Sequence, residues 1–323
     1  MSELNERVTG RAVGIVGAGS IGVAFALVFA RAGWRVHLHD PDAARRALVV
    51  GEIGTRADAL RSFNLVDENT DMLVGRVVVN ERLEDAVCSV ELVIECAPEK
   101  VELKRALFAS LDVLAPKDAI LASASSAIPV SSYAAELDGR GRCLVAHPGN
   151  PPYLIPVIEL VPADFTAPEV VQRAKEVFAS AHMRPVTVQK EVEGFIFNRL
   201  QGAVLREAYC LVRDGVATVE DIDLVMRDGV GLRWSVIGPF ETVDLNTRGG
   251  IVSHAEKMGP AYARMGAERG QNDPWTPDLV AKVDAARRNQ VPLDEWESRV
   301  AWRDLQLMRI LRDRNRAEKA GQD

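Results

Sequence analysis

Cysteines and long apolar stretches are scarce in this chain of 323 residues. The four cysteines form no Cys-x-x-Cys pair, which argues against a disulfide framework and against a metal site. Three of them lie in apolar runs, as the small buried residues of a reduced cytoplasm do. No segment approaches the roughly eighteen consecutive apolar residues that cross a bilayer. We therefore expect no structural disulfide, no bound metal and no membrane-spanning helix.

Positive charge is also in short supply. The chain has 39 Lys and Arg residues against 46 Asp and Glu, which gives a net charge of −7. Such a chain has little non-specific affinity for nucleic acid or anionic lipid, so we expect neither as a partner. Its polar start carries no apolar secretory segment, which predicts a cytoplasmic protein. The length and the hydrophobic fraction of 47% predict a soluble protein of two domains.

A glycine-rich turn follows the first predicted strand. The segment Gly17-Ala-Gly-Ser-Ile-Gly22 lies between that strand and an apolar helix, and a second strand follows. Strand, glycine turn, helix and strand in this order form the dinucleotide-binding motif. Gly17 makes the tight turn, Gly19 lets a pyrophosphate reach the backbone, and Gly22 lets the helix lie close to the strand. The predicted elements are a strand over 11–16, a helix over 23–32 and a strand over 34–39.

The residues around this turn predict which cofactor binds. Ser20 and Ile21 present N–H groups at the positive end of the helix, where the pyrophosphate is expected. Asp40 ends the second strand, and a carboxylate there accepts hydrogen bonds from the adenosine ribose and repels a 2′-phosphate. The sequence therefore predicts NAD rather than NADP. Arg45 and Arg46 follow, either softening this preference or covering a helix.

Later strands carry further polar residues at their ends. Glu99 and Lys104 follow a strand over 92–95, at the edge where the nicotinamide half of a cofactor lies. A capping glutamate and a surface lysine would give the same pattern. Ser126 belongs to a serine cluster after a strand over 119–122. Such serines commonly cap a helix, and the functional alternative is a hydroxyl that binds the substrate oxygen.

His147 and Glu159 form the most informative pair. A short apolar run over 143–146 leads into His147 and the turn Pro-Gly-Asn-Pro-Pro, and the returning apolar run over 154–161 contains a single charged residue, Glu159. An imidazole at a strand end with a carboxylate in the returning strand is what a general base and its orienting partner require. A core histidine and an edge glutamate are the alternative reading of the two residues alone.

The pattern changes near residue 190. Strands alternate with helices up to a last strand over 185–188, and only helices are predicted afterwards. The sequence thus predicts a Rossmann-type, doubly wound α/β domain over 1–190 and an all-helical domain over 191–323. Asn198 stands at the start of the first long helix, where its amide can reach the cleft of the preceding domain and bind the substrate oxygen.

Taken together, these residues resemble the L-3-hydroxyacyl-CoA dehydrogenase family. The family's site combines a serine, the histidine of an H-x-x-N-P segment, a glutamate on the next strand and the asparagine of a G-F-[IV]-x-N-R segment. The matching pieces occur here in the same order, and the likeness is closest to the lambda-crystallin and L-gulonate 3-dehydrogenase branch. They are Ser126, the segment from His147 to Pro151, Glu159 and the segment from Gly194 to Arg199.

The resemblance implies an NAD-dependent dehydrogenase that oxidises the C3 hydroxyl of a small L-3-hydroxy acid. It implies that His147 is the general base, oriented by Glu159, and that Ser126 and Asn198 bind the substrate oxygen. Ser126 and Asn150 are also expected to contact the cofactor. It also implies a homodimer.

Two arginines add an expectation about the substrate. An arginine fork binds a carboxylate through two hydrogen bonds, so Arg199 and Arg233 are candidate ligands of a small acid. Either could instead form a plain salt bridge between the domains. Two departures from the family pattern, Ala127 and Gly149, predict a reshaped pocket.

Two other functions stay open. A 3-hydroxyacyl-CoA dehydrogenase of fatty acid metabolism would need a basic patch for the CoA phosphates, for which the segment from Arg45 to Arg76 is a candidate. A crystallin-like structural protein would bind NAD without turning over any hydroxy acid.

Overall fold

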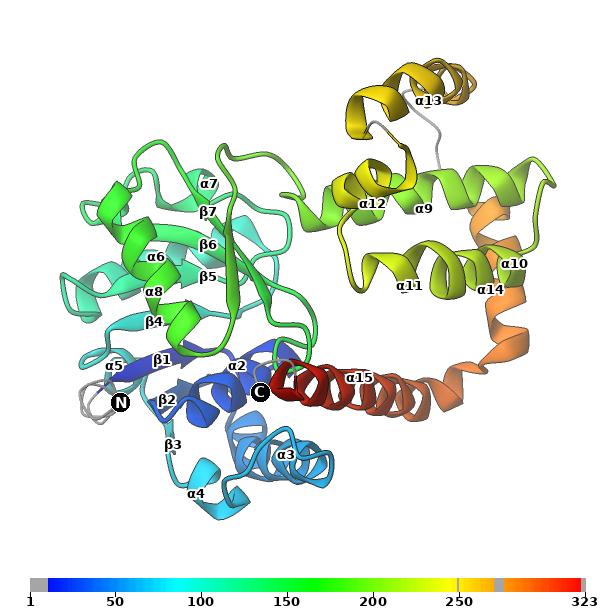
Figure 1. Cartoon of the computed structure of the whole chain (residues 1–323). Helices are drawn as coiled ribbons and strands as arrows, with labels where there is room; N and C mark the ends of the chain where they lie inside the picture. Colours follow the sequence, from blue (N-terminus) through cyan, green and yellow to red (C-terminus); the bar gives the residue numbers. More distant parts are fainter. Residues whose placement is uncertain (1–10, 249, 270–275, 321–323) are drawn as a thin grey trace. The chain divides into compact units, whose positions relative to one another are not determined.

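The computed structural model describes residues 11–248, 250–269 and 276–320. These residues divide into two compact units. The first contains residues 11–199 and 301–320, and the second contains the described residues between 200 and 300. The first unit is a sheet covered by helices and the second is helical (Figure 1).

One eight-stranded sheet organises the first unit. The strand order is β3-β2-β1-β4-β5-β6-β7-β8, with β1 to β6 parallel, β7 antiparallel to β6, and β8 parallel to β7. This arrangement confirms the predicted doubly wound sheet. The strands are β1 (Ala12–Val16), β2 (Arg35–His39), β3 (Val77–Asn80), β4 (Leu92–Glu95), β5 (Ile120–Ser123), β6 (Cys143–Pro148), β7 (Val157–Pro162) and β8 (Arg184–Thr187).

Helices cover both faces of this sheet. One apolar core lies beneath α2, α3 and α8, and the other lies beneath α5, α6 and α7. The helices of the unit before residue 190 are α2 (Ser20–Arg31), α3 (Ala43–Ser62), α4 (Thr70–Val74), α5 (Leu83–Val87), α6 (Val101–Leu114), α7 (Ser131–Ala134), the short η1 (Arg140–Arg142) and α8 (Pro168–Ser180).

Helix α2 lies in the centre of the first core. Every residue from 22 to 30 is buried, which explains why this helix has no polar face. Phe25 and Phe29 contact Phe178 of α8, with ring centroids 6.4 and 5.9 Å apart. On the other face, Gly14 of β1 lets α5 approach closely, since a Cβ there would lie 2.6 Å from the carbonyl oxygen of Ala86.

The end of α15 (Trp296–Ala320) belongs to the sheet unit (Figure 1). Met308 is buried in the core that contains α2 and α3, and the Arg312 guanidinium lies 5.7 Å from the ring centre of Phe63. Asp304 accepts a 3.2 Å hydrogen bond from the Tyr153 hydroxyl. The boundary predicted between residues 190 and 191 stays a prediction, but residues 301–320 pack with the sheet, which that division did not anticipate.

The second unit is helical, as the sequence predicted. Helix α9 begins at the end of the first unit and continues into the second. Arg269, which follows α13, forms ion pairs of 2.8 Å with Glu207 of α9 and with Asp214, the residue after α9. None of the described helices has the length and apolarity needed to cross a membrane. The elements are α9 (Phe197–Arg213), α10 (Val219–Leu224), the π-helical η2 (Val225–Val230), α11 (Gly231–Trp234), α12 (Pro239–Asn246), α13 (Gly250–Ala267), α14 (Pro277–Gln290), η3 (Leu293–Glu295) and the start of α15.

Candidate active site

The glycine turn between β1 and α2 has the geometry its three glycines predict. Gly17 has a φ of +110°, and a Cβ there would lie 2.8 Å from the carbonyl oxygen of Cys96. A Cβ at Gly22 would lie 1.9 Å from the carbonyl oxygen of Gly17. Gly19, in contrast, has no atom within 4 Å of its Cβ position. Two glycines thus permit close backbone packing, and the third leaves open space.

This open space lies at the start of α2. Gly19 precedes the first helical residue, and no side chain caps the helix there. The free N–H groups of Ser20 and Ile21 and the positive end of the helix are suited to an anionic group. The turn therefore fits the pyrophosphate of a dinucleotide, since its backbone can be approached without displacing a side chain.

Asp40 holds the turn in place from the end of β2. One carboxylate oxygen accepts a 2.7 Å hydrogen bond from the Ala18 N–H, and the other accepts one of 2.9 Å from the Asp42 N–H. A carboxylate oxygen has a second lone pair, so both retain capacity for ribose hydroxyls. Arg45 donates to the Ala18 carbonyl at 2.6 Å and Arg46 to the Asp40 carbonyl at 2.8 Å, so both arginines brace the loop backbone.

A buried ion pair lies beneath the adjacent strand ends. The Lys104 ammonium donates to both carboxylate oxygens of Glu95, at 3.0 and 2.9 Å, and the two side chains are 1% and 0% exposed. Ser123 donates to Glu95 at 2.6 Å. Lys104 was predicted to contact the cofactor or to lie on the surface. Its burial contradicts the surface reading and disfavours direct cofactor contact, because the protein already surrounds its charge.

Glu99 connects this ion pair to the serine segment. Its carboxylate lies 3.4 Å from the Lys104 ammonium. One of its oxygens accepts hydrogen bonds from the Ser125 hydroxyl at 3.0 Å, from the Ala127 N–H at 3.3 Å and from the Ser126 N–H. Ser125 is buried, whereas Ser126 is exposed. Glu99 therefore fixes the backbone that presents the Ser126 hydroxyl, a role that the sequence did not reveal.

His147 and Glu159 are direct partners across β6 and β7. They are paired in the strand register, and His147 Nδ1 lies 2.7 Å from Glu159 Oε2. The other oxygen of Glu159 accepts hydrogen bonds from the N–H groups of Ile196 and Phe197, at 2.7 and 2.9 Å. Glu159 is 1% exposed, and both of its oxygens have a partner. Because Nδ1 is engaged, Nε2 is the ring nitrogen left for a substrate.

The start of α9 completes the arrangement. The rings of Phe195 and Phe197 lie 5.6 and 6.1 Å from the His147 ring, centre to centre. Phe195 is fully buried and adopts a left-handed conformation with a φ of +50°, which is rare for a bulky residue. The Asn198 amide donates a 2.9 Å hydrogen bond to the Ser126 carbonyl. Thus Ser126, His147, Glu159 and Asn198 belong to one connected group.

Three further predicted residues, Asn150, Arg199 and Arg233, are exposed, and their predicted roles stay predictions. Asn150 and Arg199 are exposed, in the turn after β6 and near the start of α9. Arg233 is exposed in the second unit, so its predicted role is untested by the geometry of the first. A Cβ at Gly149 would lie 2.5 Å from Ile155, so this glycine is required by packing in the turn itself. In the described residues, no three His, Cys, Asp or Glu side chains form a potential metal site.

Sequence reasoning missed Glu95 and the anchoring of Glu159. Glu95 ends β4 as the last residue of a buried strand, and a carboxylate in that position was a usable signal. The backbone donors from Ile196 and Phe197 have no side-chain signature, so no residue pattern could have identified them.

Comparison with known families agrees with this geometry. Residues 12–192 match the 3-hydroxyacyl-CoA dehydrogenase NAD-binding domain, and residues 194–292 match the C-terminal domain of the same family. The chain belongs to the 3-hydroxyacyl-CoA dehydrogenase family. It is therefore an NAD-dependent oxidoreductase that acts on a CH–OH group, as the motifs predicted.

Relatives in this family include proteins with different names. The chain is 40% identical to the lambda-crystallin homolog of Bos taurus over 92% of this chain and 94% of that one. It is 38% identical to L-carnitine dehydrogenase of Streptomyces griseus over 85% of this chain and 79% of that one. Among solved structures, the chain matches one of an NAD⁺-dependent dismutase, 5-formyl-3-hydroxy-2-methylpyridine 4-carboxylic acid 5-dehydrogenase. The TM-score is 0.81 at 28% identity, over 94% of this chain and 97% of that one.

Proposed function

We propose that this dehydrogenase oxidises the C3 hydroxyl of a small, free L-3-hydroxy acid, with His147 as the general base. The observation that carries the proposal is the 2.7 Å contact between His147 Nδ1 and a buried Glu159. A carboxylate at this nitrogen fixes the tautomer whose Nε2 accepts a proton, and it stabilises the imidazolium that forms. NAD, when bound, supplies the acceptor for the hydride.

The remaining site residues bind the reacting oxygen in this proposal. The Ser126 hydroxyl and the Asn198 amide lie on segments joined by the hydrogen bond between Asn198 and the Ser126 carbonyl. Both can hold the oxygen while it changes from an alcohol to a carbonyl. Arg199, one residue further along α9, is the candidate partner for the substrate carboxylate, with Arg233 as the second.

Ion pairs within the segment from Arg45 to Arg76 favour a free acid over a CoA thioester. CoA carries phosphates that require unpaired cationic side chains. Arg76 is paired with Glu68, and Arg45 with Glu52 at 3.0 Å. These two arginines are therefore already neutralised, while Arg46 and Arg61 of the same segment form no ion pair among the described residues. One relative's name gives further support, since carnitine is a hydroxy acid without coenzyme A, whereas another relative is named 3-hydroxyacyl-CoA dehydrogenase and keeps the thioester as the alternative.

Steady-state assays distinguish the candidate functions. NAD reduction is measured on L-gulonate, carnitine, 3-hydroxybutyrate and 3-hydroxybutyryl-CoA. We expect the largest kcat/KM on a free acid. Preference for the thioester would establish the fatty acid alternative, and NADH binding without turnover of any hydroxy acid would leave the structural role.

Replacing the base provides the second test. His147→Asn removes general base catalysis, which typically contributes about 10²–10⁴-fold, so kcat should fall by at least that scale. NADH affinity, measured by fluorescence titration, should change little. Turnover near that of the wild type would show that another group removes the proton.

We also propose a homodimer formed through the second unit. Large apolar side chains are strongly exposed there, including Val236 at 84% and Phe240 at 78%. Exposed apolar patches of this kind mark interaction surfaces. Light scattering coupled to size exclusion should give twice the chain mass, and Val236→Asp with Phe240→Asp should give the monomer. A monomeric wild type at micromolar concentration would contradict this.

A further inference from the structure

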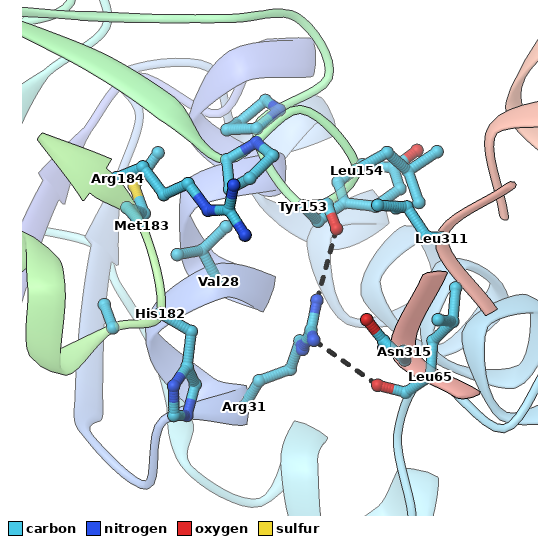
Figure 2. A pocket seen from close by; sticks show the side chains of 13 residues that line it. Val28, Arg31, Leu65, Tyr153, Leu154, His182, Met183, Arg184, Leu311 and Asn315 are labelled. Carbon is cyan, nitrogen blue, oxygen red and sulfur yellow. Dashed lines mark hydrogen bonds between the residues drawn. The ribbon is translucent and has the colours of Figure 1, made fainter. Parts of the chain in front are cut away.

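A cavity of about 300 Å³ lies in the first unit and shares no residue with the site described above. Five segments line it: the end of α2, the chain after α3, the β6–β7 connection, the start of β8 and the end of α15. Figure 2 shows these side chains around one common space. The β6–β7 connection joins His147 to Glu159, so a ligand here would touch the segment between them.

The lining is cationic in a protein that is acidic as a whole. Arg31, Arg184 and His182 line the cavity, and no Asp or Glu does. Figure 2 shows the guanidinium groups of Arg31 and Arg184 directed into the same space. Arg184 forms no ion pair among the described residues. In a chain with a net charge of −7, two arginines in a cavity whose lining has no carboxylate favour an anionic ligand there.

Arg31 is held in position by neutral groups. Its guanidinium donates to the carbonyl oxygens of Tyr153 at 3.2 Å and Leu65 at 3.4 Å, drawn as dashed lines in Figure 2. Burial lowers the pKa of Arg31, because the cation is removed from water without a carboxylate beside it. A desolvated, oriented guanidinium of this kind is suited to bidentate binding of an oxyanion.

The rest of the wall is apolar. Val28, Leu65, Leu154, Met183 and Leu311 contribute hydrocarbon surface to the cavity. A bare inorganic anion would leave this surface in contact with water, whereas an acid with a short hydrocarbon chain would cover it. The two kinds of surface together specify an amphipathic ligand.

We propose that this cavity is a second ligand site, which binds a small organic carboxylate between Arg31 and Arg184. The short hydrocarbon body of the ligand lies against the apolar wall. The site is separate from the dinucleotide turn and from the His147–Glu159 pair, and the proposal does not depend on which hydroxy acid the enzyme oxidises.

Calorimetric titration of the NAD-saturated full-length enzyme tests the proposal. The probes are hexanoate, the uncharged 1-hexanol and inorganic phosphate. We expect saturable binding of hexanoate, with 1-hexanol at least about tenfold weaker because it lacks the charge. Phosphate binding without hexanoate binding would overturn the carboxylate assignment, as would equal affinity for hexanoate and 1-hexanol.

Two charge-matched variants localise the binding. Arg184→Gln removes an exposed side chain with no described partner, so folding should be retained, and hexanoate affinity should fall about tenfold or more. Arg35→Gln, an exposed arginine of β2 outside the cavity lining, should leave the affinity unchanged. Equal hexanoate affinity in wild type and Arg184→Gln would place binding elsewhere, including the active site, and overturn the proposal.

Discussion

Replacing Glu159 by glutamine tests the catalytic arrangement most directly. The carboxylate contacts three groups: Nδ1 of His147 at 2.7 Å, and the N–H groups of Ile196 and Phe197 at 2.7 and 2.9 Å. An amide oxygen can still accept from the two backbone donors. The amide NH₂ then faces His147 Nδ1 and acts as a donor, so Nδ1 must become the acceptor.

The expected loss follows from this change of tautomer. With Nδ1 accepting, the ring proton is carried by Nε2, and a protonated Nε2 cannot take a proton from the substrate. General base catalysis contributes about 10²–10⁴-fold, and we expect kcat to fall by that amount while the fold is retained. Glu159→Ala differs, because it also leaves the backbone donors without a partner. A buried donor left without an acceptor costs about 1–3 kcal/mol, so this variant should also unfold more easily.

The assay compares three enzymes. For wild type, Glu159→Gln and Glu176→Gln, kcat is measured on the best hydroxy acid, NADH affinity by fluorescence and stability by urea unfolding. Glu176 is exposed on α8, and its change to glutamine controls for the loss of one negative charge. If Glu159→Gln retained kcat within threefold of the wild type, with normal folding and NADH binding, orientation of His147 by Glu159 would be refuted.

Three further outcomes are expected. Gly19→Ala should change the unfolding free energy by less than about 0.5 kcal/mol, since nothing lies within 4 Å of the new methyl, yet it should weaken NADH binding about tenfold in fluorescence titrations. Gly17→Ala should instead destabilise the fold by more than about 1 kcal/mol, because Gly17 has a φ of +110° and its new methyl would lie 2.8 Å from a carbonyl oxygen. Lys104→Met should lower the unfolding free energy in urea by about 3–5 kcal/mol, because it leaves Glu95 charged and buried without its partner. A thiol reagent at pH 8 should label the exposed Cys88 and spare Cys143, because burial raises the pKa of Cys143 to about 12. Since folding keeps the Cys143 thiol neutral, its contribution to stability is full below about pH 9 and is lost as the pH rises toward 12.

The parts of the site that are local in sequence could be predicted. Gly17 to Asp40 lie within one strand–helix–strand unit, so turn, helix and acid are specified by neighbouring residues. The pair of His147 and Glu159 also follows from a local pattern, because two apolar runs joined by a short turn place their polar residues on adjacent strands. In both cases the hydrophobic pattern predicts the strands, turn or helix, and these elements place the polar side chains.

The parts that depend on distant residues could not be predicted. Lys104 lies on a helix, where a lysine usually faces solvent, and it is buried because Glu95 of β4 and Ser123 of β5 converge on its ammonium. Similarly, the last helix has a charged sequence typical of a surface, yet Met308 is buried against the sheet unit. Neither result follows from periodicity, because each depends on which elements the fold brings together.

The two oxygens of Glu159 connect folding with catalysis. One oxygen contacts His147 on β6, and the other accepts from the N–H groups of Ile196 and Phe197 where α9 begins, the helix that also carries Asn198. The left-handed Phe195 at this junction is maintained by complete burial beside the His147 ring. In the proposed mechanism, the same carboxylate therefore fixes both the tautomer of His147 and the start of the helix that carries Asn198. A change that loosens this junction should reduce kcat even when every side chain that touches the substrate is retained.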